Sequence, residues 1–117
     1  MIVNLDLQIN ELSEKVLTAI IDVLGNKLDK VILYGSYARG DYDNESDIDF
    51  FILADVPQDE AGKWRSHIRD RISGIDMEYD LFVSLHVTGC EVFYRFVDIL
   101  PYYANVIRDG IKLYDSK

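Results

Sequence analysis

The chain has 117 residues, 49% of them hydrophobic, and this length is typical of one domain. We therefore expect a single domain over residues 1–117. Its 21 acidic and 12 basic side chains give a formal net charge of -9. A field of that sign repels the phosphates of DNA, RNA and anionic membranes, which argues against a protein that binds nucleic acid directly. A partner protein with basic patches, or a small anion held through metal ions, suits this charge better.

Cysteine content and hydropathy limit the cellular compartments in which we expect the protein. Cys90 is the single cysteine, so an internal disulfide and a cysteine-rich zinc site are excluded. The first 15 residues lack the basic and apolar regions of a signal peptide, and no apolar run approaches the roughly 20 residues that span a bilayer. We expect a cytoplasmic protein that does not associate with a membrane.

The first half of the chain predicts a helix and a strand before a polar segment. Apolar residues at three- and four-residue steps predict a helix over about residues 8–24, which Gly25 ends. The short apolar run from Val31 to Tyr34 predicts a buried strand, followed by a turn at Gly35-Ser36. Residues 36–46 are polar, and we expect a loop or a short helix there.

The second half predicts strands alternating with helices. The expected elements are a strand over 48–54, a helix opened by Pro57 and closed by Gly74, a strand over 77–85, a helical segment over 88–100, a short helix from Pro101 to Asp109, and a last strand at IKLY, residues 111–114. This order predicts an α/β or α+β fold in which helices flank a small sheet.

Two aspartates at the start of the 48–54 strand are the first candidate site residues. In a strand, Asp47 and Asp49 lie on the same face, roughly 6.6 Å apart along the chain, while Ile48 points to the core. Their mutual repulsion favours a hard divalent cation between them. An acidic pair alone is more often a solvated surface feature. The preceding turn changes this balance, because Gly35 allows close approach of a ligand and Ser36 offers a hydroxyl and backbone N–H groups to a phosphate.

Asp80 is the candidate third carboxylate. If the 77–85 strand pairs beside the strand of Asp47 and Asp49, Asp80 lies one strand spacing, roughly 4.8 Å, from the pair. Three converging carboxylates would make a two-metal site for an in-line displacement at phosphorus. Glu78 lies on the same face of that strand and competes for the role.

These motifs together resemble the polymerase-beta-like nucleotidyltransferases. The residues that carry the resemblance are Gly35-Ser36, Ala38-Arg39-Gly40, Ser46-Asp47-Ile48-Asp49 and Asp80. The match is close over residues 31–85, and the short length is similar to the minimal nucleotidyltransferase (MNT) branch. The resemblance implies a mixed sheet with helices packed against it, Mg²⁺, and a nucleoside triphosphate as substrate.

The resemblance also implies a role for each site residue. Asp47, Asp49 and Asp80 would be catalytic and would bind metal, two Mg²⁺ ions in all, and Asp80 would take the proton of the attacking hydroxyl. Gly35, Ser36, Arg39 and Ser46 would bind the nucleotide, with Ser36 at the triphosphate and Arg39 at phosphate charge.

MNT proteins are similar to the antitoxins of HEPN/MNT toxin–antitoxin pairs. The resemblance implies a partner, a cognate HEPN ribonuclease toxin, to whose tyrosine hydroxyl the protein would transfer AMP from ATP by a two-metal mechanism. Two alternatives stay open: neutralisation of a toxin by complex formation alone, and nucleotidyl transfer to a small molecule. Larger relatives carry a further domain for nucleic acid or antibiotic, and we expect none in this chain.

Several conspicuous residues are interpreted as structural. His67 and His86 are expected to be surface or packing residues, and Cys90 to pack in a helix. The aromatic residues of FYRF and PYYA are expected mainly in the core, with a partner surface as the alternative. The acidic stretch of Asp41, Asp43 and Glu45 is interpreted as a solvated loop.

Overall fold

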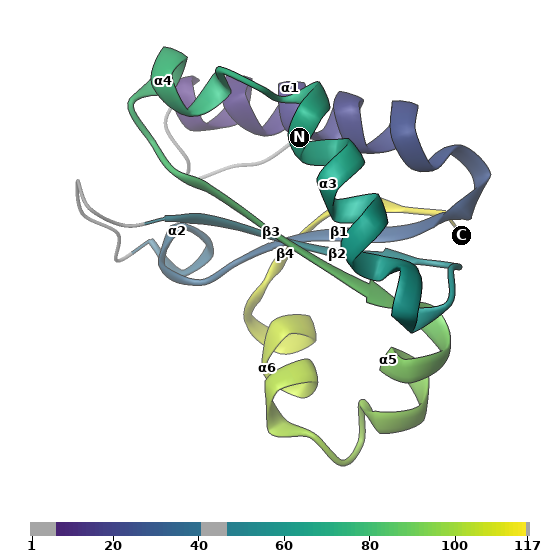
Figure 1. Ribbon diagram of the computed structural model, residues 1–117. Coiled ribbons are helices and arrows are strands. Elements are labelled where there is room, and N and C mark those ends of the chain that lie inside the picture. Colours follow the sequence, from purple (N-terminus) through teal and green to yellow (C-terminus); the bar gives the residue numbers. More distant parts are fainter. Residues whose placement is uncertain (1–6, 41–46, 117) are drawn as a thin grey trace.

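A computed structural model describes residues 7–40 and 47–116 (Figure 1). Within these residues, strands β1 (Leu28–Tyr34), β2 (Ile48–Ala54), β3 (Val83–Gly89) and β4 (Ile111–Asp115) form one sheet in the order β3-β2-β1-β4. β1 pairs antiparallel with β2 and with β4, whereas β2 and β3 are parallel. The sheet is therefore mixed, with β3 and β4 at its two edges.

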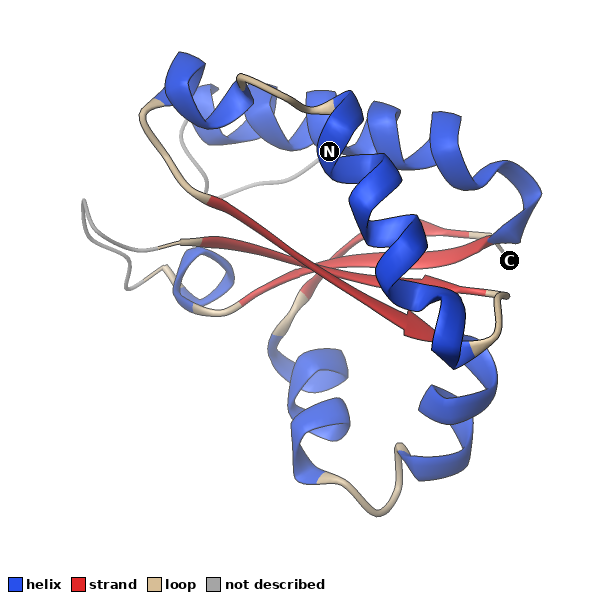
Figure 2. Cartoon of the chain, viewed as in Figure 1, coloured by secondary structure: helices blue, strands red, loops and turns tan. Residues whose placement is uncertain are grey.

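Helices cover both faces of this sheet. Helices α1 (Leu7–Leu24), α3 (Ala61–Arg71) and α4 (Ile75–Tyr79) lie on one side, and α5 (Cys90–Phe96) and α6 (Pro101–Asp109) lie on the other (Figures 1 and 2). The short helix α2 (Ser36–Arg39) follows β1, and the single-turn 3-10 helices η1 (Gly25–Lys27) and η2 (Gln58–Glu60) precede β1 and α3. This arrangement confirms the expected fold class.

The central strands are apolar because each face packs against helices. On one face, Phe50 joins the large core that includes Leu12, Val16 and Ile20 of α1, three residues at four-residue steps. On the other face, Phe51 joins a smaller core with Phe93 of α5 and Val106 of α6. Alternate residues of β2 thus serve two cores, and a polar residue on this strand stands out.

Most predicted elements are confirmed, some of them with shifted ends. The predicted helix over 8–24 corresponds to α1, and the strand over 48–54 to β2. The Val31–Tyr34 strand begins earlier, at Leu28. The helix from Pro101 and the last strand correspond to α6 and β4. No helix among the described residues combines the length and apolarity needed to cross a bilayer.

Two predictions between β2 and α5 are wrong. The helix expected from Pro57 to Gly74 divides into η2 and α3, and Gly74, with φ of 88°, opens the separate helix α4. The strand expected over 77–85 begins only at Val83 and continues to Gly89, which shortens the following helix to α5. The physical reason is that the apolar pattern of this segment fits both a strand and a helix. A helical turn buries Ile75 and Tyr79, which are four residues apart, on the same side.

Candidate active site

Asp49 lies near the beginning of β2, on the face of the sheet that carries α5 and α6. It pairs with Tyr34 of β1 on one side and with Ser84 of β3 on the other. Since side chains alternate along a strand, Asp49 shares its face with Phe51, which is buried under α5 and α6. Its own side chain is 24% exposed. Asp49 thus lies where the aromatic core ends and the open part of this face begins.

Gly35 makes room for the Asp49 carboxylate. A Cβ on Gly35 would lie 2.5 Å from Asp49 Oδ2, closer than Cβ contacts occur, and the φ of Gly35 is +78°. Two separate properties of glycine are therefore used here: the missing Cβ and the left-handed backbone. The turn between β1 and α2 lies against the carboxylate, so Gly35 and Asp49 meet in space.

A histidine and a serine of β3 stand beside Asp49. His86 Nε2 lies 3.7 Å from Asp49 Oδ1 and 2.9 Å from the hydroxyl of Ser84. The two residues are two apart on one strand and so share its face. His86 lies within β3, because this strand continues to Gly89 and does not end at residue 85 as predicted. The alternation in Val83-Ser-Leu-His-Val was the sequence signal for this pair.

Two tyrosines, one on β1 and one on α6, lie on the same side of the sheet. The hydroxyls of Tyr34 and Tyr102 lie 3.0 Å apart, and the ring centroids of Tyr34 and His86 are 5.6 Å apart with the planes steeply inclined. Burial raises the pKa of Tyr34 above its ordinary value, and the hydrogen bond with Tyr102 raises it further. Tyr34 therefore stays an uncharged hydroxyl beside the carboxylate of Asp49.

The third predicted carboxylate is not on the neighbouring strand. Asp80 follows α4 in a left-handed conformation, with φ of 53°, and is exposed three positions before β3 begins. The prediction that Asp80 lies one strand spacing from Asp49 is wrong, because the residue of β3 that pairs with Asp49 is Ser84. The competitor Glu78 lies on α4, where it forms an ion pair of 2.9 Å with Lys15 of α1.

The structure describes the other predicted site residues only in part. Asp47 is exposed and directly precedes β2, two residues before Asp49 in the sequence. Ser36 and Arg39 begin and end α2, but their side chains lie outside the described part of the structure. Ser46 and the acidic stretch at 41–45 also lie outside the described residues.

The donor atoms at this site fit a hard cation that a substrate helps to hold. Asp47 and Asp49 offer carboxylate oxygens, the ligands that Mg²⁺ prefers, and 24% of the Asp49 side chain is exposed. Within residues 7–40 and 47–116, no cluster of three or more His, Cys, Asp or Glu side chains could hold a metal ion. In magnesium sites of nucleotide enzymes, one or two carboxylates commonly act together with substrate phosphates and water. The described residues match that arrangement.

The residues interpreted as structural behave in different ways. His67 is exposed on α3 with its ring 5.8 Å from that of Trp64. Cys90 is half-buried at the start of α5, as predicted. Of the aromatic residues, Phe93 is 1% exposed, whereas Tyr94 and Tyr102 are close to half exposed. The FYRF and PYYA segments therefore contribute to the smaller core and also reach the surface.

A mixed sheet that presents a carboxylate against a glycine turn agrees with a nucleotidyltransferase fold. The family comparison agrees: residues 9–109 match the Nucleotidyltransferase domain family, and the chain belongs to it.

Two curated relatives come from Methanocaldococcus jannaschii. "Putative protein adenylyltransferase MJ0141" is 40% identical over 81 residues, which are 69% of this chain and 80% of the relative. "Putative protein adenylyltransferase MJ0604" is 32% identical over 105 residues, which are 86% of this chain and 97% of the relative.

Solved structures show the same fold at lower identity. A structure described as "a putative nucleotidyltransferase from Sulfolobus solfataricus" superimposes with a TM-score of 0.59 at 19% identity, over 93% of this chain and 84% of that one. A toxin–antitoxin structure with AMP-PNP superimposes with a TM-score of 0.55 at 21% identity, over 89% and 74%. A mutant of the toxin–antitoxin MntA-HpeT gives a TM-score of 0.56 at 19% identity, over 89% and 73%.

Proposed function

We propose that this nucleotidyltransferase is a protein adenylyltransferase that transfers AMP from ATP to a tyrosine hydroxyl of a partner protein. The observation that carries the proposal is the fit of Asp49 against Gly35, next to Asp47 and in a chain of this family. The relatives from Methanocaldococcus jannaschii, whose names specify protein adenylylation, favour a protein acceptor. The likeness to MntA-HpeT favours a HEPN toxin as that acceptor and an antitoxin role for the chain.

The proposed reaction is a displacement at the α-phosphorus of ATP. The tyrosine oxygen forms a bond to the α-phosphorus, the bond from that phosphorus to the bridging oxygen breaks, and pyrophosphate leaves. The phenolic proton is released to solvent. Bound Mg²⁺ would neutralise phosphate charge during the displacement. Asp47 and Asp49 would hold it, and the nucleotide phosphates would complete its ligands.

The other residues of this face would orient the reactants. The uncharged hydroxyls of Tyr34 and Tyr102 provide hydrogen-bonding groups next to the smaller aromatic core. His86 and Ser84 border Asp49 on the side of the open sheet edge. Gly35 and Ser36 would receive the triphosphate, with Arg39 and Ser46 as further phosphate contacts. The net charge of -9 disfavours a free anionic nucleotide and favours its entry together with a metal ion.

Intact-mass spectrometry of a candidate toxin tests this proposal. The toxin is incubated with this protein, Mg²⁺ and each of four ribonucleoside triphosphates in turn. We expect the mass of one or more AMP units with ATP, and none with the Asp49→Asn variant. Retention of the toxin complex by that variant is the control for folding.

A non-catalytic antitoxin is the second candidate, favoured by the half-exposed aromatic residues Tyr94 and Tyr102. It predicts that wild type and Asp49→Asn neutralise the toxin equally well and that the toxin mass never changes. Transfer to a small molecule predicts consumption of ATP only when a metabolite extract replaces the toxin.

A further inference from the structure

The outer edge of β3 is an open strand edge beside the candidate active site. β3 is the last strand of the sheet, and β2 is its one pairing partner among the described residues. Ile48 N–H donates to the carbonyl of Phe82, so the backbone groups of Phe82, Ser84 and His86 point toward β2. Because backbone direction alternates along a strand, the N–H and C=O groups of Val83, Leu85, Val87 and Gly89 point outward.

The two ends of this edge are hydrogen-bonded and its middle is not. The Arg69 guanidinium donates to the carbonyl of Val83, and the Gln58 side chain accepts from Gly89 N–H at 2.8 Å. No partner is found within residues 7–40 and 47–116 for the outward backbone groups of Leu85 and Val87. Soluble proteins usually protect such an edge with lysine, proline or a covering segment. The sequence VSLHVTG contains neither residue.

Two hollows, of about 360 and 400 Å³, flank this open stretch. The first lies between β3, α3 and α6 and is bordered by Tyr102, and the second lies between β3 and α3 and is bordered by Ser84. Arg65, Leu85 and His86 line both. His86 is also the residue 3.7 Å from Asp49. The open edge is thus continuous with the candidate active site.

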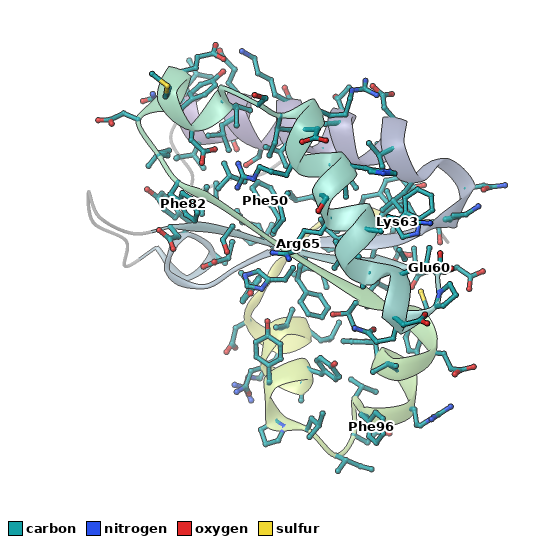
Figure 3. The ribbon with its side chains drawn as sticks, viewed as in Figure 1. Phe50, Glu60, Lys63, Arg65, Phe82 and Phe96 are labelled. Carbon is teal, nitrogen blue, oxygen red and sulfur yellow. The ribbon has the colours of Figure 1, made fainter. Side chains whose placement is uncertain are left out.

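Arg65 gives this edge a positive charge in an acidic protein. It is exposed on α3 and extends over β3 (Figure 3), and no ion pair of Arg65 is found in the described part of the chain. By contrast, Arg69 beside it pairs with Asp76 at 3.2 Å. A carboxylate from outside this chain would complement Arg65.

We propose that the acceptor protein docks here as an added β-strand, through an extended segment in which a tyrosine is adjacent to an acidic residue. This inference rests on the proposed adenylyl transfer and specifies how its acceptor binds. Strand addition supplies backbone hydrogen bonds for affinity and flanking hollows for side-chain specificity. The open N–H and C=O groups of Leu85 and Val87 would pair with the added strand.

The spacing between strands explains why the acceptor side chain must be long. An added strand lies roughly 4.8 Å beyond β3, and Asp49 is a further strand spacing away on β2. A tyrosine on the face of Ser84 and His86 reaches further toward Asp49 than a serine, whose hydroxyl stays near its own backbone. The residue beside the tyrosine in the added strand points to the opposite face, where α3 carries Arg65, and this residue is the acidic one.

Amide exchange measured by NMR on the intact protein without nucleotide tests the docking separately from transfer. The probe is an acetylated heptapeptide, Thr-Val-Glu-Tyr-Val-Thr-Val. We expect new protection of the Leu85 and Val87 amides and none at the other sheet edge, β4. A copy of the peptide with lysine in place of glutamate should bind about fivefold more weakly, as should the peptide to the Arg65→Glu variant. The matched control is Lys63→Glu, an exposed residue of the same helix outside both hollows.

The outcomes of this experiment separate the two proposals. Absence of binding, protection confined to other strands, or equal binding of the lysine peptide would overturn the docking site. Protection of Leu85 and Val87 without any AMP transfer from ATP to the bound peptide or a toxin would retain the docking site and reject the adenylyltransferase. If Arg65→Glu weakens ATP binding as much as peptide binding, Arg65 belongs to the nucleotide site and the proposed acidic contact is wrong.

Discussion

Replacing Gly35 by alanine tests whether the glycine turn holds the Asp49 carboxylate in its working position. The new Cβ would lie 2.5 Å from Asp49 Oδ2, whereas ordinary contact begins at 3.4 Å, so the two must separate by 0.9 Å. A misplacement of about 1 Å in an active site can lower the rate about 100-fold. We therefore expect Gly35→Ala to lower kcat for AMP transfer by about two orders of magnitude.

The same substitution also costs stability, and this cost needs its own control. A non-glycine residue at a φ of +78° costs about 1–2 kcal/mol, which lowers the melting temperature by roughly 4 °C or more per kcal/mol. Gly74 has a φ of +88°, and a Cβ added there would meet nothing within 4 Å, so Gly74→Ala carries the backbone cost alone.

The assay compares both variants by calorimetry and by the rate of AMP transfer to the toxin under saturating ATP. We expect a loss in melting temperature for both variants, at least as large for Gly35→Ala because of the added clash, and a large loss of rate for Gly35→Ala alone. Equal rates for the two variants, after correction for the folded fraction, would refute the proposed fit between Gly35 and Asp49.

Three further predictions address the site, the thiol and the core. Asp49→Asn should lower the rate of AMP transfer at least 100-fold, whereas Asp80→Asn should retain most of the rate, because Asp80 is exposed after α4. Steady-state rates check this, and similar losses for the two variants would show that Asp80 belongs to the active site. Burial, together with the nearby Asp29 and Asp55, raises the pKa of the Cys90 thiol to about 11. Alkylation by iodoacetamide at pH 8 should therefore be on the order of 100-fold slower in the folded than in the urea-unfolded chain, and equal rates would contradict the burial argument. Ile20→Ala, at a fully buried position of α1, should cost about 2–5 kcal/mol in urea unfolding and leave the transfer rate of the folded fraction unchanged.

The parts of the site that could be predicted from sequence depend on local patterns. The apolar run after Asp49 predicts β2 with its correct ends, because a strand buried on both faces leaves few polar positions. Gly35 follows a β-branched apolar run, so the turn and its glycine could also be placed. Their meeting follows from the antiparallel pairing of β1 and β2 across a short connection.

The third strand could not be placed from local patterns. The segment around Tyr79 and Asp80 fits a strand and a helical turn about equally well, and the buried pair Ile75 and Tyr79 decides for the helix only in the folded protein. The register that sets Ser84 beside Asp49 depends on pairing between residues of β2 and β3 that are 35 positions apart in the sequence. The contact between Tyr34 and Tyr102 likewise joins residues 68 positions apart. Such contacts leave no periodic signal in the sequence.

The central claim, AMP transfer at the Asp49 site, is tested most directly by ATP radiolabelled at either the α- or the γ-phosphate. The purified protein, Mg²⁺ and the toxin are incubated with each label, and the toxin is then separated and counted. We expect that the α label stays on the toxin, that the γ label leaves with pyrophosphate, and that Asp49→Asn abolishes the labelling. Transfer of the γ label would show a phosphoryl transferase instead, and absence of both labels from a toxin that is nevertheless neutralised would contradict catalysis.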